Sequence, residues 1–237
     1  MDDSKIYRWT GWCGLAAIAF FFIEFPFYLV RSPFPGLAES AKLADFAAHN
    51  GTNIMCCVFL DLIILTLLMI FMAGVRHLIR QANHEWLASL FFGVGLVYVA
   101  LTLVADSLQG ATVIDAFNPP ADGVVIRAMM ESMFLMYGAV ALWLMALFIA
   151  ILSYVTLASG ALPRWSAWIG CACALVCLAF VPAMFVRHVD MMGFYNPVGL
   201  GPQAFANGFP LAAWMIAVGI LMIRKGKPVA PSVTAPK

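Results

Sequence analysis

The chain has 237 residues, of which 64% are hydrophobic and 11% are charged, and its formal net charge is +1. Soluble domains carry roughly 25% charged residues, so the composition excludes an ordinary soluble protein, and the near-neutral charge gives no reason to expect nucleic acid as a partner. We predict an all-α fold, a polytopic membrane helix bundle whose main partner is the lipid bilayer.

A helix that crosses the hydrocarbon core requires about 20 residues, so a chain of 237 residues has room for roughly six or seven spans. We expect six transmembrane helices at residues 11-30, 54-74, 86-108, 128-157, 165-186 and 209-223. They would form a single transmembrane domain over residues 1-224. The tail, 225-237, is basic and then rich in proline, which predicts a disordered cytoplasmic segment.

Two connections carry clear turn signals. The paired proline and glycine residues of QGATVIDAFNPPADG predict an irregular segment between the third and fourth spans. In the stretch SGALPRW, Gly160 suits the end of the fourth helix and Pro163 suits the start of the fifth.

The distribution of basic residues predicts the orientation. Six spans place both termini on one side, and most Lys and Arg residues fall on that side: Lys5, Arg8, Arg76, Arg80, Arg164, Arg224, Lys225, Lys227 and Lys237. Cytoplasmic loops are enriched in Lys and Arg. We therefore expect a plasma-membrane protein with both termini in the cytoplasm and a working face on the outer side, where the longer connections lie.

Acidic residues inside the first two spans are the main functional signal. Glu24 and Asp61 each lie about 9 to 10 Å from the predicted outer end of their helix. A charged side chain at the centre of a membrane helix costs about 2.5 to 3.5 kcal/mol on insertion scales. Both carboxyl groups should therefore face the interior of the bundle, where they are protonated, paired or hydrated. Taken singly, each is equally well explained as a hydrogen-bonding contact between helices.

A polar stripe leads from the outer surface to Asp61. Asp45, His49, Asn53, Cys57 and Asp61 are each four residues apart, which places them along one helical face. If Asn50 and Gly51 break the helix, the stripe is reduced to its last three members.

Further polar residues lie at similar depth on the third and fourth spans. Tyr98, Thr102 and Asp106 are again four apart, and Glu131 has an i,i+4 partner in Arg127. A solvated role is favoured for Asp106 and Glu131, which lie near helix ends, and packing is favoured for the tyrosines. The candidate binding residues of an outward-facing polar cavity are Glu24, Asn53, Asp61, Tyr98, Thr102, Asp106, Glu131 and Tyr137.

Metal and cofactor chemistry is not predicted. The four histidines fall at or beyond the ends of the spans, where they are poorly placed to hold haem. The six cysteines contain no C-x-x-C motif and are better explained as small buried apolar residues.

Two functions of different classes fit these residues. The first is binding or movement of a small apolar or amphiphilic molecule, or of a cation, with Asp61 and Glu24 as counter-charges or proton carriers. The second is an intramembrane enzyme of the isomerase or cyclase type, in which one carboxyl group acts as general acid and the other as base on a lipid-like substrate.

The six-span layout, the acidic residue in the second span and the turn SGALPRWSAWIG resemble a family of bacterial six-helix integral membrane proteins of unknown function. In that family a stretch similar to Ser159, Gly160, Leu162, Pro163, Arg164 and Trp165 joins the fourth and fifth spans. The resemblance extends over residues 8-223. It implies an integral membrane protein, and it carries over no site residues.

Overall fold

The structure is a computed structural model that describes residues 2–31, 34–35, 37, 39–118, 121–186, 194–196, 205–206 and 208–226, without the side chain of residue 41. Helices account for nearly all of these residues, and the described part contains no strand. The helices are α1 (Asp3–Leu29), α2 (Ser40–His49), α3 (Gly51–Gln81), α4 (Glu85–Phe117), α5 (Gly123–Leu135), η1 (Met136–Val140), α6 (Ala141–Ser159), α7 (Arg164–Phe180), η2 (Val181–Phe185) and α8 (Phe209–Lys225). The all-α prediction is confirmed.

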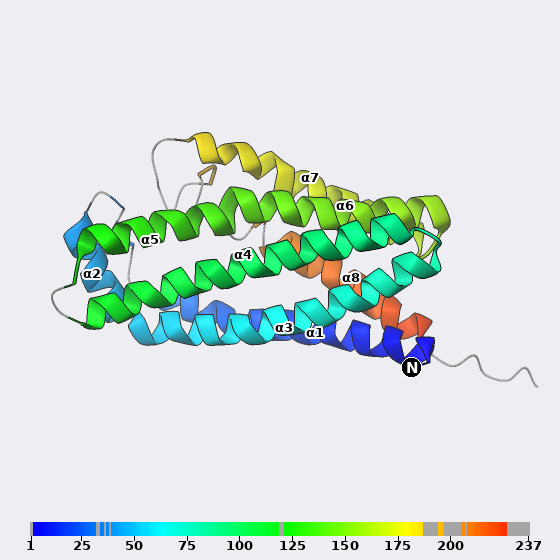
Figure 1. The fold of residues 1–237 in the computed structure, drawn as a ribbon, viewed down its shortest axis with the longest axis horizontal. Coiled ribbons are helices and arrows are strands. Elements are labelled where there is room, and N and C mark those ends of the chain that lie inside the picture. Colours follow the sequence, from blue (N-terminus) through cyan, green and yellow to red (C-terminus); the bar gives the residue numbers. More distant parts are fainter. Residues whose placement is uncertain are drawn as a thin grey trace, which may run out of the picture.

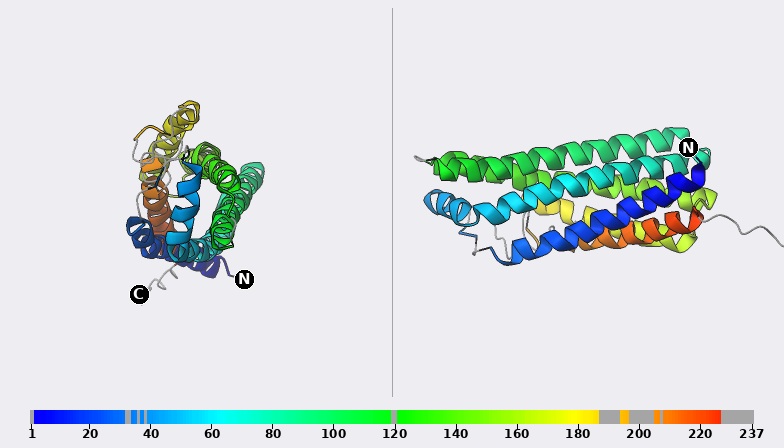
Figure 2. Two further views of the ribbon diagram at one scale, coloured as in Figure 1. Left: turned by 90° about the vertical axis from the view of Figure 1, so that its left-hand side faces the viewer. Right: turned by 90° about the horizontal axis from the view of Figure 1, so that it is seen from below.

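The long helices run roughly parallel to one axis and follow one another around a ring (Figure 1, Figure 2). Each packs against the next in the chain: α1 on α3, α3 on α4, α4 on α5 and α6, α6 on α7, and α7 on α8. The ring closes because α8 also packs against α1. The start of α1 and the end of α8 lie at the same end of the bundle (Figure 1).

Five helical segments are long and apolar enough to cross a membrane: Asp3–Leu29, Gly51–Gln81, Glu85–Phe117, Gly123–Ser159 and Arg164–Phe185. They include the first five predicted spans. The sixth predicted span corresponds to α8, which has 17 residues.

The third span extends beyond its predicted end. α4 continues to Phe117, so the prediction of an irregular segment from Gln109 onwards is wrong for its first nine residues. Gly110 lies inside the helix, where Thr112 and Val113 are buried against neighbouring helices. One glycine weakens a helix by only about 1 kcal/mol. The burial of the residues that follow it is enough to keep this part of α4 helical. α4 ends where Asn118 precedes the proline pair, because a residue before proline disfavours the helical conformation.

The connection between the first two spans contains a separate helix, α2, and the helix breaks at Asn50 and Gly51, the alternative that the sequence left open. α2 covers one end of the bundle and packs against α4 and α5 (Figure 1). It ends at His49, and α3 begins at Gly51 after the cap residue Asn50. The break therefore separates Asp45 and His49 from Asn53, Cys57 and Asp61, and the longer stripe does not form.

The fourth span is interrupted, and the fifth is shorter in α-helical form than predicted. A π-helical turn, η1, separates α5 from α6, and Gly138 inside it has non-helical backbone angles. The α-helix of the fifth span ends at Phe180, because Pro182 lacks the N–H that an α-helix requires, and a 3-10 turn follows. Gly160 ends α6 in the left-handed conformation (φ 68°) and Pro163 caps α7, as predicted.

The predicted disordered tail lies outside the described residues, apart from Lys225 and Gly226. Lys225 is the last residue of α8. Its ammonium group donates a hydrogen bond to the Ala161 carbonyl (3.2 Å), which ties the end of α8 to the turn between α6 and α7.

Two apolar clusters fill the bundle. The larger one occupies the half nearer the chain termini and is centred on aromatic rings from α3, α4, α6 and α8: Phe71, Phe91, Tyr98, Phe148 and Trp214. The smaller one lies beneath α2 and joins it to α4 and α5 through Leu43, Ala47, Ala105, Ile126, Met130, Met133 and Phe134.

Candidate binding site

The first side of the site comes from the end of α1. Glu24 is 2% exposed, Tyr28 follows it on the same helical face at i+4, and Arg31 comes just after the end of α1. The Tyr28 hydroxyl interacts electrostatically with Glu24. The guanidinium of Arg31 lies 4.1 Å from the centre of the Tyr28 ring, a cation–π contact.

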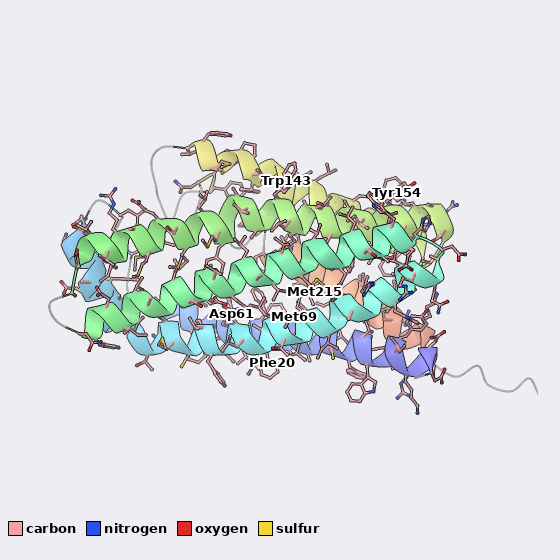
Figure 3. The ribbon with its side chains drawn as sticks, viewed as in Figure 1. Phe20, Asp61, Met69, Trp143, Tyr154 and Met215 are labelled. Carbon is pink, nitrogen blue, oxygen red and sulfur yellow. The ribbon has the colours of Figure 1, made fainter. Side chains whose placement is uncertain are left out.

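Cys57 and Asp61 bring α3 into the same site. Arg31 Nη2 donates a hydrogen bond to Cys57 Sγ (3.0 Å). Cys57 also interacts electrostatically with Glu24. A chain of polar contacts thus joins α1 to α3, and Asp61 lies one turn further along α3, in the half of the bundle nearer α2 (Figure 3).

Asp106 from α4 and Tyr137 from η1 complete the group. The Tyr137 hydroxyl donates a hydrogen bond to Asp106 Oδ1. Asp106 and Asp61 also interact electrostatically.

We call Glu24, Asp61 and Asp106 the carboxyl cluster. Each of its members interacts electrostatically with at least one of the others, although they come from three different helices. The cation that interacts with Glu24 and Asp61 is Arg31. Three acidic groups therefore face one arginine in the described part of the chain.

Two oxygens of the cluster have no hydrogen-bond partner within the described residues. These are Glu24 Oε1 and Asp106 Oδ2, and both are fully buried. Asp106 as a whole is 1% exposed. A buried polar atom left without a partner costs about 1 to 3 kcal/mol, and more when it is charged. The two oxygens therefore favour a donor, such as an N–H group, at this position.

The surroundings of the cluster strengthen its electrostatic interactions. It lies between the aromatic cluster on one side and the cluster beneath α2 on the other. Interactions between charges are stronger in such a low-dielectric layer than in water. A cation that reached the cluster would therefore be held more strongly than at the surface.

The structure does not bring all candidate residues together. Asn53 is half-buried two turns before Asp61. Thr102 donates to the Tyr98 carbonyl within α4 (2.9 Å), and the Tyr98 ring packs on Phe148. Tyr98 nevertheless interacts electrostatically with the cluster.

Glu131 lies apart from the cluster. It accepts a hydrogen bond from Arg127 Nε (2.8 Å), and both side chains are almost half exposed, at 46% and 47%. Exposed pairs of this kind contribute about 0 to 1 kcal/mol to stability. The solvated role favoured for Glu131 fits this position, whereas Asp106, for which the same role was favoured, is buried.

Three residues of the site are absent from the sequence-based candidates. Tyr28 shares the helical face of Glu24 and Arg31 comes just after the end of α1, so extending the search by two turns would have found them. Gln109 lies three residues after Asp106, is buried, and also has an oxygen without a partner. It was missed because α4 was expected to end before it.

Within the described residues, no group of three or more His, Cys, Asp or Glu side chains is arranged to hold a metal ion. Comparisons of the chain with protein-family profiles, with curated proteins and with solved structures find no match. The resemblance to six-helix bacterial membrane proteins therefore stays a prediction.

Proposed function

We propose that the chain is a multi-pass protein of the plasma membrane that binds a small organic cation at the carboxyl cluster. The observation that carries this proposal is the pair of buried oxygens without partners, Glu24 Oε1 and Asp106 Oδ2, in a cluster with more acidic than basic groups. A protonated amine supplies both a positive charge and several N–H donors. Its N–H groups would donate hydrogen bonds to the two oxygens, and its positive charge would offset the charge of ionised carboxyl groups.

A six-span topology is part of this proposal. α8 has 17 residues, the lower end of the range of about 17 to 25 residues that spans a bilayer. It lies in the half of the bundle nearer the N-terminus (Figure 1) and ends beside the start of α1, where a side chain on Gly226 would clash with the Ser4 carbonyl and Arg8. Among the described residues, Lys and Arg are more frequent at this end, which favours cytoplasmic termini.

The charge preference of the site gives the first experiment. Three probes of similar size, benzylammonium, benzyl alcohol and benzoate, are titrated into the purified protein in nanodiscs of zwitterionic lipid. The proposal predicts saturable binding of benzylammonium and at least about tenfold weaker binding of the other two, since a charged hydrogen bond contributes about 1.5 to 3 kcal/mol. Equal binding of the three probes would contradict a cation site.

The electrostatic interaction between Asp61 and Asp106 favours a second candidate function. Two neighbouring carboxyl groups, one protonated and one ionised, can act as acid and base on one substrate atom, as an intramembrane isomerase would require. The lipid composition of membranes that hold the wild-type protein is compared with that of membranes holding Asp61→Asn. An enzyme acting on lipid changes the composition in an Asp61-dependent way, and a binding protein does not.

A further inference from the structure

A groove lies on the outer side of α1 and α3, separate from the carboxyl cluster. It has a volume of about 530 Å³ and is walled mainly by Ile23 and Phe27 of α1 and by Met55, Cys56, Phe59 and Leu60 of α3. Phe117 from the end of α4 also lines it. Its volume falls within the range of about 300 to 1,000 Å³ that is usual for small-molecule sites.

The lining of this groove is almost wholly apolar. Ile23, Met55 and Phe59 expose 54%, 42% and 62% of their surface, so the groove opens outward from the bundle. Both walls belong to candidate membrane spans. α1 diverges from α3 toward the end that α2 covers (Figure 2), and the groove lies between these parts of the two helices.

The groove and the carboxyl cluster use adjacent residues of the same two helices. Ile23 precedes Glu24, and Leu60 precedes Asp61. Successive helical residues are separated by about 100°, so one wall of the groove and one side of the cluster share each helix. Phe27 of the groove wall precedes Tyr28, which interacts electrostatically with Glu24.

We propose that the groove and the carboxyl cluster form one site for an amphiphile with a single hydrocarbon chain and a protonated amine head. The chain lies in the groove and the amine lies at Glu24. This inference rests on the proposed function and names its ligand class. The acidic excess of the cluster excludes an anionic head, and the apolar walls beside it fit a chain.

The amine head of the amphiphile must account for any preference for the groove over the surrounding bilayer. Lipid tails are as apolar as the side chains of the groove, so a chain gains little by leaving the bilayer for the groove. A neutral amphiphile should therefore visit the groove no more than any other lipid-facing surface, whereas an amine is retained by its charged hydrogen bonds.

The test uses dodecylamine with a photoreactive diazirine near the end of its chain, and the corresponding alcohol as the neutral control. The protein is labelled in phosphatidylcholine nanodiscs, and the cross-linked residues are identified by mass spectrometry. The amine should label the groove residues about tenfold more than the alcohol does, as expected for one charged hydrogen bond. Equal labelling by the two probes would overturn the inference, because it would identify the occupant as bulk lipid.

Two substitutions that fill the groove, Met55→Trp and Phe27→Trp, should each abolish the excess labelling by the amine. The matched control is Leu62→Trp, since Leu62 is exposed on α3 but does not line the groove. Excess labelling that survives both groove variants, or that is lost equally in the control, contradicts the proposal.

Benzylammonium separates this inference from the proposed function, because it has no chain to place in the groove. If its binding requires Glu24 while the long amine does not label the groove, the groove is no part of the site and the cation site stands. If Glu24→Gln changes neither benzylammonium binding nor amine labelling, both proposals are wrong.

Discussion

Tyr137 donates a hydrogen bond from its hydroxyl to Asp106 from a π-helical turn in the middle of the fourth span. Such turns are rare and occur frequently at functional sites. Here the turn separates the helix that packs beneath α2 from the helix that packs into the aromatic cluster. The carboxyl group of Asp106 is thus oriented at the boundary between the two apolar clusters.

Replacing Tyr137 by phenylalanine should destabilise the protein. The substitution leaves Asp106 buried with neither oxygen bonded to a tyrosine, and an unsatisfied buried acceptor costs about 1 to 3 kcal/mol. The measurement is the free energy of unfolding in detergent with increasing denaturant. Tyr154→Phe is the control, because Tyr154 is exposed on α6 and its substitution should stay within about 0.5 kcal/mol. Equal effects of the two substitutions would contradict a specific role for the Tyr137 hydroxyl.

Close helix packing predicts a second difference between two similar substitutions. A methyl group at Gly74 of α3 would overlap with the Thr10 side chain of α1, whereas a methyl group at Gly93 of α4 would meet nothing within 4 Å. Gly74→Ala should therefore lower the free energy of unfolding by about 1 to 3 kcal/mol. Gly93→Ala should be neutral or slightly stabilising. If both variants unfold alike in the same denaturant series, the contact between α1 and α3 is looser than described.

The six-span topology predicts which positions are accessible from outside the cell. Single cysteines are introduced at Lys5, Glu39, Asn83 and Lys227 of a cysteine-free variant and treated with a membrane-impermeant maleimide in intact cells. Only the cysteine at position 39 should react, since the other three positions fall on the predicted cytoplasmic side. A reactive cysteine at position 227 with an unreactive one at position 5 would show that α8 does not cross the membrane.

Much of the fold follows from local sequence signals. Apolar runs of about 20 residues identify the candidate spans, and Gly160 with Pro163 identifies the turn between α6 and α7. The end of α4 and the π turn are different, because each depends on contacts with other helices. Thr112 and Val113 remain helical because they are buried, and a hydropathy pattern carries no information on that burial.

The candidate site was also predictable only in part. The depth of a residue along its helix can be calculated from the sequence, and the similar depths of Glu24 and Asp61 indicated that they belong to one site. The approach of Asp106 to Asp61 depends on how α4 packs against α3, and the end of the polar stripe at Asn53 depends on the helix break at Asn50. Residue spacing gives the face of each helix but not which faces meet.

The central claim is that the carboxyl cluster holds an organic cation, and the most direct test compares two glutamates. Benzylammonium is titrated calorimetrically into the wild type, Glu24→Gln and Glu131→Gln in nanodiscs. Loss of the buried charged partner should weaken binding by about tenfold or more in Glu24→Gln, while the exposed Glu131→Gln should bind as the wild type does. Unchanged binding in Glu24→Gln, or equal weakening in both variants, would contradict the claim.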